Sequence, residues 1–374
     1  MKLAFCLFKY FPYGGLQRDF LRIAEECIRR GHTVTVYCMS WEGYCPPDLI
    51  VKLVRTRGLQ NHSRCKSFVK RVHPQLTREN YDRIIGFNKM PGLDFYYAAD
   101  TCYQARVRAK HKEWWYRWLP RYHQWIAYEK AVFGIQKHTH ILLIAKAQQT
   151  VFARYYGTQP ERFHLLPPGI AKDRIAPENA LEVREAARKE FGFTPNEFLV
   201  LFVGSGFKTK GLDRALLGLA ALPKELRDTT KLWVVGKDNQ DLFVQKAHNL
   251  GLDNQVTFLG GRDDIPRLML AADLLVHPAY HENTGTVLLE AIVSGLPVLT
   301  TDVCGYANYV LQAEAGIVLH TPFKQDEFNQ SLQDMLLSFS KRKQWQQNGI
   351  AFAKKADLYS MPERAVDMIE LLQC

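Results

Sequence analysis

Two carboxylates eight positions apart, Glu282 and Glu290, lie in the stretch of this sequence whose residue types best suit chemistry. The apolar residues 274–276 before them predict a buried parallel strand, and a helix is expected from about Thr284 until Gly295 ends it. In such a strand–loop–helix unit a ligand binds at the carboxyl end of the strand, where free N–H groups of the helix attract phosphate. The stretch therefore predicts a site for a phosphorylated ligand.

A nucleotide sugar has a diphosphate that needs donors and hydroxyl groups that need acceptors, and this stretch offers both. We expect Glu282 to hold a hexose and Glu290 to hold a ribose, because carboxylates accept strong hydrogen bonds from hydroxyl groups. An isolated pair of this kind is more often a helix cap and a solvated helix residue, so the interpretation depends on the flanking strand, glycines and helix. The neighbouring residues expected to contact the diphosphate or the sugar are Asn283, Thr284, Gly285, Thr286 and Val287.

A second phosphate-binding turn is predicted after the apolar residues 198–203. Gly204 and Gly211 flank Lys208 and Lys210 at the expected start of a helix, and glycines with lysine at a helix N-terminus suit a diphosphate. The spacing differs from that of the G-x-x-x-x-G-K-[ST] loop. We expect Lys210 to stabilise the charge that grows on a leaving diphosphate.

The first residues of the chain repeat the strand–turn–helix pattern. Residues 2–8 predict a strand and residues 16–30 an amphipathic helix. Gly14 and Gly15 in the turn between them permit close approach of the backbone to a phosphate, although an ordinary turn also explains two adjacent glycines. Asp19 is expected either to point back towards this site or to complement the helix dipole.

The glutamate pair in this setting resembles the E-x7-E signature of the retaining glycosyltransferases of family 4. Residues 2–19 and 87–94 resemble the branch of that family that adds the first hexose to lipopolysaccharide heptose, and the similarity extends over the whole chain. The resemblance implies the α/β fold called GT-B, in which two Rossmann-like domains face each other across a cleft. It further implies a UDP-sugar as donor, with glucose and an α-1,3 linkage expected, and the inner core on lipid A as acceptor.

Other functions remain open at this point. Galactose or an N-acetylhexosamine needs only small changes of the sugar pocket, and another acceptor is compatible with the same motifs. The same fold also supports UDP-sugar epimerases and hydrolases, and a membrane-bound adaptor with an inactive pocket is a non-enzymatic alternative.

The resemblance also assigns roles to residues outside these motifs. It places Asp100, where many relatives have histidine, at the acceptor hydroxyl as an orienting group or base, so that Asp100, Glu282 and Lys210 form the expected catalytic set. Arg174 is expected at the donor phosphate and Arg262 near the uracil. A threonine precedes the lysine of the second turn where many relatives have arginine, so Lys208 is expected to supply that charge. From the residues alone, Asp100 is equally well a helix cap and Arg174 a solvated linker charge.

No metal or other cofactor is expected. Asp263 and Asp264 are adjacent, so their side chains diverge, and the chain lacks the D-x-D flanked by hydrophobic residues that metal-dependent transferases use. The eight cysteines are scattered and predict neither disulfides nor a zinc site, which indicates a reducing compartment. Apolar runs are too short for a signal peptide or a membrane-spanning helix, so a cytoplasmic protein is expected.

The length of 374 residues suits two domains. Residues 165–170 resemble the hinge between the two domains of the family. We therefore expect an acceptor-binding domain over residues 1–168, joined by a crossing helix within residues 357–374, and a nucleotide-sugar-binding domain over residues 169–356.

Positive charge is concentrated in the first half of the chain. Residues 1–170 contain 27 Lys and Arg against 12 Asp and Glu, or +15, whereas residues 171–374 contain 22 against 26, or −4. The densest part, residues 103–130, also contains four of the seven tryptophans. The aromatic residues that would share one helical face are Trp114, Trp118, Tyr122 and Trp125, although Pro120 interrupts such a helix.

A basic surface with aromatic side chains suits the headgroup level of an anionic membrane. We expect residues 103–130 to attach the protein to the inner face of the bacterial inner membrane, unless the tryptophans pack inside the domain. Nucleic acid is not an expected partner, because no recognition motif accompanies the charge.

Overall fold

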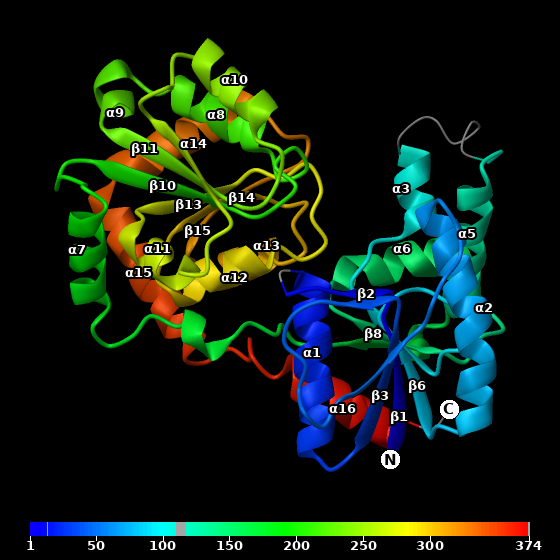
Figure 1. Ribbon diagram of the computed structural model, residues 1–374. Helices are drawn as coiled ribbons and strands as arrows, with labels where there is room; N and C mark the ends of the chain where they lie inside the picture. Colours follow the sequence, from blue (N-terminus) through cyan, green and yellow to red (C-terminus); the bar gives the residue numbers. More distant parts are fainter. Residues whose placement is uncertain (13, 110–116, 373–374) are drawn as a thin grey trace. The chain divides into compact units, whose positions relative to one another are not determined.

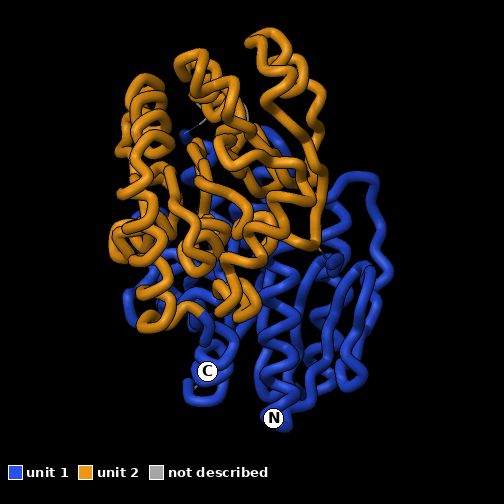
Figure 2. The backbone as a smooth tube through the Cα atoms, turned by 90° about the vertical axis from the view of Figure 1, so that its left-hand side faces the viewer, with its two compact units in different colours: residues 1–169, 359–374 blue, residues 170–358 orange. Residues whose placement is uncertain are grey.

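The computed structural model describes residues 1–12, 14–109 and 117–372, and the chain forms two compact units (Figure 2). Unit 1 comprises residues 1–169 and 359–374, and unit 2 comprises residues 170–358. The C-terminal segment therefore returns to the first unit, and the limits of the units lie one and two residues from those expected from the hinge.

Unit 1 is built on a parallel sheet of seven strands in the order β5-β3-β1-β6-β7-β8-β9, with a small sheet of β2 and β4 beside it (Figure 1). Its strands are β1 (Lys2–Cys6), β2 (Lys9–Tyr10), β3 (Thr33–Cys38), β4 (Ser40–Trp41), β5 (Ile50–Leu53), β6 (Arg83–Gly86), β7 (Phe95–Ala98), β8 (His140–Leu143) and β9 (Phe163–Leu165). Its helices are α1 (Gly15–Arg29), α2 (Asn61–Glu79), α3 (Tyr103–Ala109), α5 (Pro120–Phe133), α6 (Lys146–Tyr156), η1 (Pro160–Arg162) and α16 (Met361–Leu371).

Both faces of this sheet are buried, because successive side chains of a strand point to opposite faces. Leu3 and Phe5 of β1 belong to a core shared with α1 and α16, whereas Ala4 and Cys6 belong to a core shared with α2, α5 and α6. Figure 1 shows α1 and α16 on one face and α2 and α5 on the other. The near-continuous apolar sequence of β1 follows from this double burial.

The C-terminal helix α16 is an integral part of unit 1. Its residues Met361, Val366 and Ile369 are at most 1% exposed and lie in the core beside α1. Arg30, just after α1, donates to Asp367 and Glu370 at 2.8 Å each, which fixes the two helices side by side.

Unit 2 has a parallel sheet of six strands in the order β12-β11-β10-β13-β14-β15. Its strands are β10 (Phe198–Val203), β11 (Thr230–Val235), β12 (Val256–Gly260), β13 (Leu274–His277), β14 (Val298–Thr301) and β15 (Gly316–Leu319). Its helices are η2 (Lys172–Arg174), α7 (Ala180–Glu190), α8 (Leu212–Ala220), α9 (Lys224–Asp228), α10 (Asp241–Asn249), α11 (Ile265–Ala271), α12 (Thr286–Val293), α13 (Ala307–Gln312), α14 (Gln325–Leu337) and α15 (Phe339–Ala353).

Counted along the chain, the strands of unit 2 lie in the order 3-2-1-4-5-6, which is that of a doubly wound Rossmann fold. Unit 1 begins with the same 3-2-1-4-5 order if β2 and β4 are set aside. The expected pair of Rossmann-like domains is thus confirmed. Among the described residues, none of the helices is both long enough and apolar enough to cross a bilayer.

Candidate active site

The strand order of unit 2 changes direction between β10 and β13, and the loops that leave these two strands meet there. Lys210 in the first loop donates from Nζ to Glu282 Oε2 in the second, as an ion pair. A Cβ on Gly211 would lie 2.0 Å from the carbonyl oxygen of Pro278, and one on Gly204 would lie 2.8 Å from Cδ of Lys210. Glycine at both positions therefore allows the close approach that joins the predicted lysine and glutamate.

Glu282 is ionised because of its neighbours. Burial would raise its pKa, but His277 and Lys210 lower it to about 2. His277 Nε2 lies 3.6 Å from Glu282 Oε2, and burial lowers the pKa of this histidine. The site thus contains a carboxylate acceptor for hydroxyl groups beside a lysine cation.

His277 is a residue that the sequence interpretation missed. It is fully buried at the end of β13, and neither ring nitrogen has a hydrogen-bond partner among the described residues. A polar residue that ends an apolar strand five positions before Glu282 was the available signal.

The loop from Glu282 to Gly285 is held by the turn before α13. The N–H of Tyr306 donates to the Thr284 carbonyl at 2.7 Å, and a Cβ on Gly305 would lie 2.0 Å from the Asn283 carbonyl oxygen. Gly285 precedes α12 with φ of +79°, so the helix begins at Thr286 and not at the expected residue 284. Thr286 and Val287 lie in the first turn of α12, where backbone N–H groups have no partner within the helix.

Glu290 and Arg174 are also brought together. Glu290 in α12 is 7% exposed, and Arg174 Nε lies 3.9 Å from its Oε1. Nε and Nη1 of Arg174 are buried and have no hydrogen-bond partner in the part of the chain that the structure describes. Buried guanidinium N–H groups of this kind are suited to an anionic ligand.

Two predicted cations pair with neither Glu282 nor Glu290. Lys208 is exposed, and no hydrogen bond from it is found among the described residues. Arg262 forms a two-point ion pair with Asp264, at 2.8 and 2.6 Å. Its guanidinium is therefore engaged locally.

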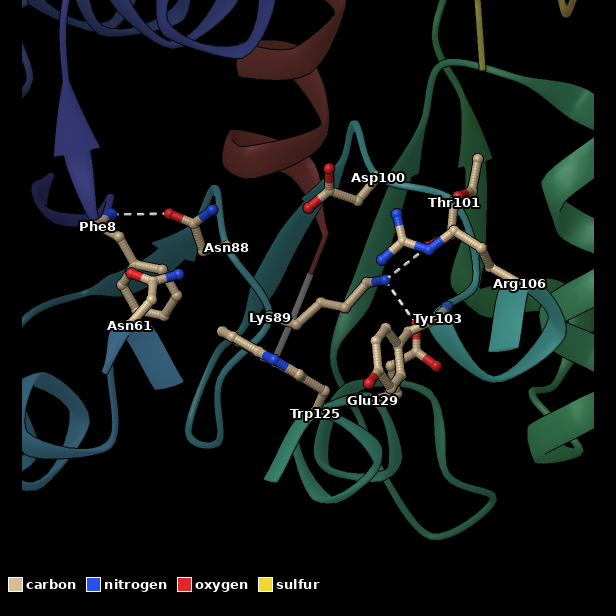
Figure 3. Close-up of a pocket in the computed structure, with 10 residues that line it drawn as sticks. All are labelled: Phe8, Asn61, Asn88, Lys89, Asp100, Thr101, Tyr103, Arg106, Trp125 and Glu129. Atoms are coloured by element: carbon tan, nitrogen blue, oxygen red, sulfur yellow. Dashed lines mark hydrogen bonds and ion pairs between the residues drawn. The ribbon is translucent and has the colours of Figure 1, made fainter. Parts of the chain in front are cut away.

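The predicted residues of unit 1 fall into two places. Gly14 caps the N-terminus of α1, and the space beside the Cα of Gly15 is open, since a Cβ there would meet nothing within 4 Å. Asp19 accepts a hydrogen bond from Tyr97 Oη at 2.9 Å, and burial raises its pKa. Asp100 is exposed after β7 and lines a separate pocket of about 340 Å³ (Figure 3).

The expected aromatic face over residues 103–130 is not formed by the described residues. Pro120 is the first residue of α5, so Trp118 precedes the helix and is 84% exposed. Tyr122 is buried against Val107, and Trp125 packs on the core and lines the Asp100 pocket. Trp114 lies outside the described residues. The shared face is wrong for Trp118, which precedes α5, and Tyr122 and Trp125 turn inward. The expected break at Pro120 is confirmed, because this proline is the first residue of α5.

Among the described residues, no group of three or more His, Cys, Asp or Glu side chains is placed to hold a metal ion. The geometry that is present combines carboxylates, cations and a helix N-terminus at the switch point of a Rossmann-like sheet.

Comparison with known proteins supports a common origin for this arrangement. Residues 13–174 match the family described as glycosyltransferase family 4, and residues 183–352 match glycosyl transferases group 1. The lipopolysaccharide glucosyltransferase WaaG of Escherichia coli (strain K12) is 47% identical over 369 residues, which cover 99% of this chain and 98% of that protein.

Solved structures agree. A crystal structure of WaaG, described as a glycosyltransferase involved in lipopolysaccharide biosynthesis, has a TM-score of 0.94 and 46% identity, and covers 99% of this chain and 100% of its own. Anabaena HepE in complex with UDP and glucose has a TM-score of 0.74 with 20% identity over the full length of both chains, and it shares the fold.

Proposed function

Because this chain belongs to glycosyltransferase family 4, as a hexosyltransferase of the GT-B fold, we propose that it transfers glucose from UDP-glucose to an inner-core heptose of lipopolysaccharide. The observation that carries this proposal is the meeting of Lys210 and Glu282 at the switch point of unit 2. The similarity to a lipopolysaccharide glucosyltransferase over nearly the whole chain supports the acceptor and the sugar.

The donor binds through unit 2 in this proposal. Glu282 accepts hydrogen bonds from the glucose hydroxyl groups, and Glu290 accepts them from the ribose. The diphosphate lies at the N-terminus of α12, where the helix offers N–H donors. Lys210 and the buried N–H groups of Arg174 stabilise the negative charge of the leaving UDP, so we propose that no metal ion is required.

Transfer replaces the bond between C1 of glucose and the phosphate oxygen by a bond from C1 to a heptose hydroxyl oxygen. The hydroxyl attacks from the face that UDP leaves, so the configuration at C1 is retained, and its proton passes to the departing diphosphate. Asp100 orients the acceptor in this proposal. Holding both substrates in one geometry supplies much of the rate gain.

The test is transfer onto lipopolysaccharide truncated at the inner-core heptoses, with UDP-glucose, UDP-galactose and their N-acetyl forms as donors and EDTA in every reaction. We expect transfer from UDP-glucose alone, at a rate that EDTA does not lower. Loss of activity in EDTA would overturn the metal-free step. Full transfer by a Glu282→Ala variant would overturn the assignment of the donor site.

We also propose that unit 1 binds the anionic cytoplasmic face of the inner membrane. Residues 1–170 have a net charge of +15, and the exposed Trp118 stands between the exposed Arg117 and Arg121. Sedimentation with vesicles tests this: binding to vesicles with anionic lipid should weaken as salt rises and in Trp118→Ala. Equal binding to neutral and anionic vesicles would contradict the proposal.

A further inference from the structure

The pocket beside Asp100 lies at the switch point of the sheet in unit 1. Phe8 follows β1, and Asn88 and Lys89 follow β6, which is the neighbour of β1 on the side where the strand order reverses. The N–H of Phe8 donates to Asn88 Oδ1 at 2.7 Å, so the two loops are joined. Ligands of open parallel sheets bind at this place.

Lys89 is fixed in the pocket with one donor to spare. Its Nζ donates to the carbonyl oxygen of Thr101 at 2.9 Å and to Glu129 Oε1 at 2.6 Å (Figure 3). An ammonium group has three hydrogens, so these two oxygens leave one for a ligand, although Nζ also lies 5.4 Å from the centroid of the Phe152 ring. The side chain is only 9% exposed, which limits its freedom before a ligand arrives.

Glu129 positions the N-terminus of α3 as well as Lys89. It is fully buried and accepts hydrogen bonds from the backbone N–H groups of Tyr103 at 2.7 Å and Gln104 at 3.2 Å, at the N-terminus of α3. The segment between β7 and α3, which carries Asp100, is thereby held from inside the domain. Lys89 and Asp100 are therefore supported by one buried carboxylate.

The charges around the pocket are balanced. Lys89 and Arg106 supply two positive charges, and Asp100 and Glu129 supply two negative charges. Figure 3 shows the charged ends of Lys89, Asp100 and Arg106 turned towards the middle of the pocket. A phosphate group is favoured by an excess of positive charge, whereas the hydroxyl groups of a neutral sugar both donate and accept.

The remaining lining is also that of a sugar site. The rings of Phe8 and Trp125 supply apolar surface, and the amide nitrogen of Asn88 is a donor, since its Oδ1 is occupied by Phe8. The volume of about 340 Å³ is at the lower end of the range for small-molecule pockets, about 300–1,000 Å³.

We infer that this pocket is the subsite for one uncharged sugar ring of the acceptor, with Lys89, Asn88 and Asp100 as its hydrogen-bonding groups. The inference rests on the proposed function for the identity of the acceptor. Glu129 is a positioning residue, because it acts through Lys89 and the segment that carries Asp100.

The test uses the full chain and a delipidated core oligosaccharide that ends in heptose and has had its phosphates removed. In Asn88→Asp the hydrogen bond from Phe8 is kept while the amide donor is lost. We expect its Kd for the oligosaccharide by calorimetry, and its acceptor KM, to rise about tenfold, as for a lost hydrogen bond in a binding site. The KM for UDP-glucose should stay within about twofold, because unit 2 is unchanged.

The matched control is Gln75→Glu, the same change of amide to carboxylate at a partly buried position of α2 outside the pocket. It should bind the oligosaccharide like the unaltered protein. Equal affinity of Asn88→Asp and the unaltered protein would overturn the subsite, as would a failure of the unaltered protein to bind the oligosaccharide or binding that requires its phosphates. If binding is lost in Asn88→Asp but no donor gives transfer, the subsite is supported and the proposed reaction alone fails.

Discussion

At the scale of single residues, the chemistry depends on charges that are held by other buried groups. Glu282 is a useful acceptor only while it is ionised, and Lys210 and His277 keep it so. In unit 1 the same principle is seen in Lys89, which is kept in place by Glu129. In both places the state of one charged side chain thus depends on the groups packed against it.

The ionisation of Glu282 predicts a pH dependence of stability. Its pKa is lowered from 4.5 in the unfolded chain to about 2 in the folded protein, so the carboxylate stabilises the fold fully above about pH 4.5. This contribution is lost as the pH falls from 4.5 towards 2. Urea unfolding of the unaltered protein and Glu282→Gln should differ by a constant free energy between about pH 7 and 5, and the difference should shrink below that. A difference that grows on acidification would contradict the electrostatic account.

The buried pair Lys89 and Glu129 predicts a large loss of stability when one partner is removed. Lys89→Met should lower the free energy of unfolding by about 3–5 kcal/mol, because Glu129 is left as an uncompensated charge. The double variant Lys89→Met/Glu129→Gln should recover part of the loss, since no buried charge remains. Denaturant unfolding measures both. If the free energy of unfolding lost in the double variant equals the sum of the losses in Lys89→Met and Glu129→Gln, the pair is not coupled.

At the scale of elements, the proposed donor site is made by the loops that leave β10 and β13. Gly211 has a left-handed conformation with φ of +78°, and a Cβ there would lie 2.0 Å from the Pro278 carbonyl oxygen. Gly192 has φ of +76° with nothing within 4 Å of a Cβ, so it supplies a control with the same backbone strain.

Gly192→Ala should lower stability by about 1–2 kcal/mol, the cost of a left-handed non-glycine residue. Gly211→Ala should lower it further, because the Pro278 backbone must move, and should also weaken UDP binding. Thermal unfolding and UDP titration of the two variants test this. Equal stability and equal UDP affinity of Gly211→Ala and Gly192→Ala would show that the contact between the two loops has no role.

Elements were predicted well where a local pattern determines them. The apolar runs before Gly204 and Glu282 are the strands β10 and β13, and the glycine-flanked turns after them contain Lys210 and Glu282 as expected. Contacts between residues far apart in the chain could not be predicted in the same way. Lys89 and Glu129 are forty positions apart, and only the packing of α5 against the loop after β6 brings them together.

The aromatic stretch shows the opposite case. Helical spacing placed Trp118, Tyr122 and Trp125 on one outer face, but spacing does not say which way a helix turns its faces. In the structure Tyr122 and Trp125 face inward, because α3 and the core of unit 1 offer apolar surface there.

At the scale of the whole molecule, each unit has its own sheet and core, and the chain passes from the first to the second and returns. The core residue Ile369 of α16 belongs to unit 1, whereas Phe328 of α14 belongs to unit 2, and both are fully buried. Replacement of either by alanine should cost about 2–5 kcal/mol.

The two substitutions should affect different parts of the unfolding. UDP stabilises the unit that binds it, so the transition lowered by Phe328→Ala should be raised by UDP. The transition lowered by Ile369→Ala should not respond to UDP. Calorimetry of both variants with and without UDP measures this. If only Ile369→Ala lowers the transition that responds to UDP, the nucleotide binds unit 1 and the proposal is contradicted.

The most direct test of the central claim is the structure of the product. Truncated lipopolysaccharide that ends in inner-core heptoses is incubated with UDP-glucose, and the product is examined by NMR for the anomeric form and position of the new linkage. We predict one α-linked glucose on a heptose with the unaltered protein, and none with Glu282→Ala. A β-linked product, or no transfer of glucose to heptose, would contradict the account.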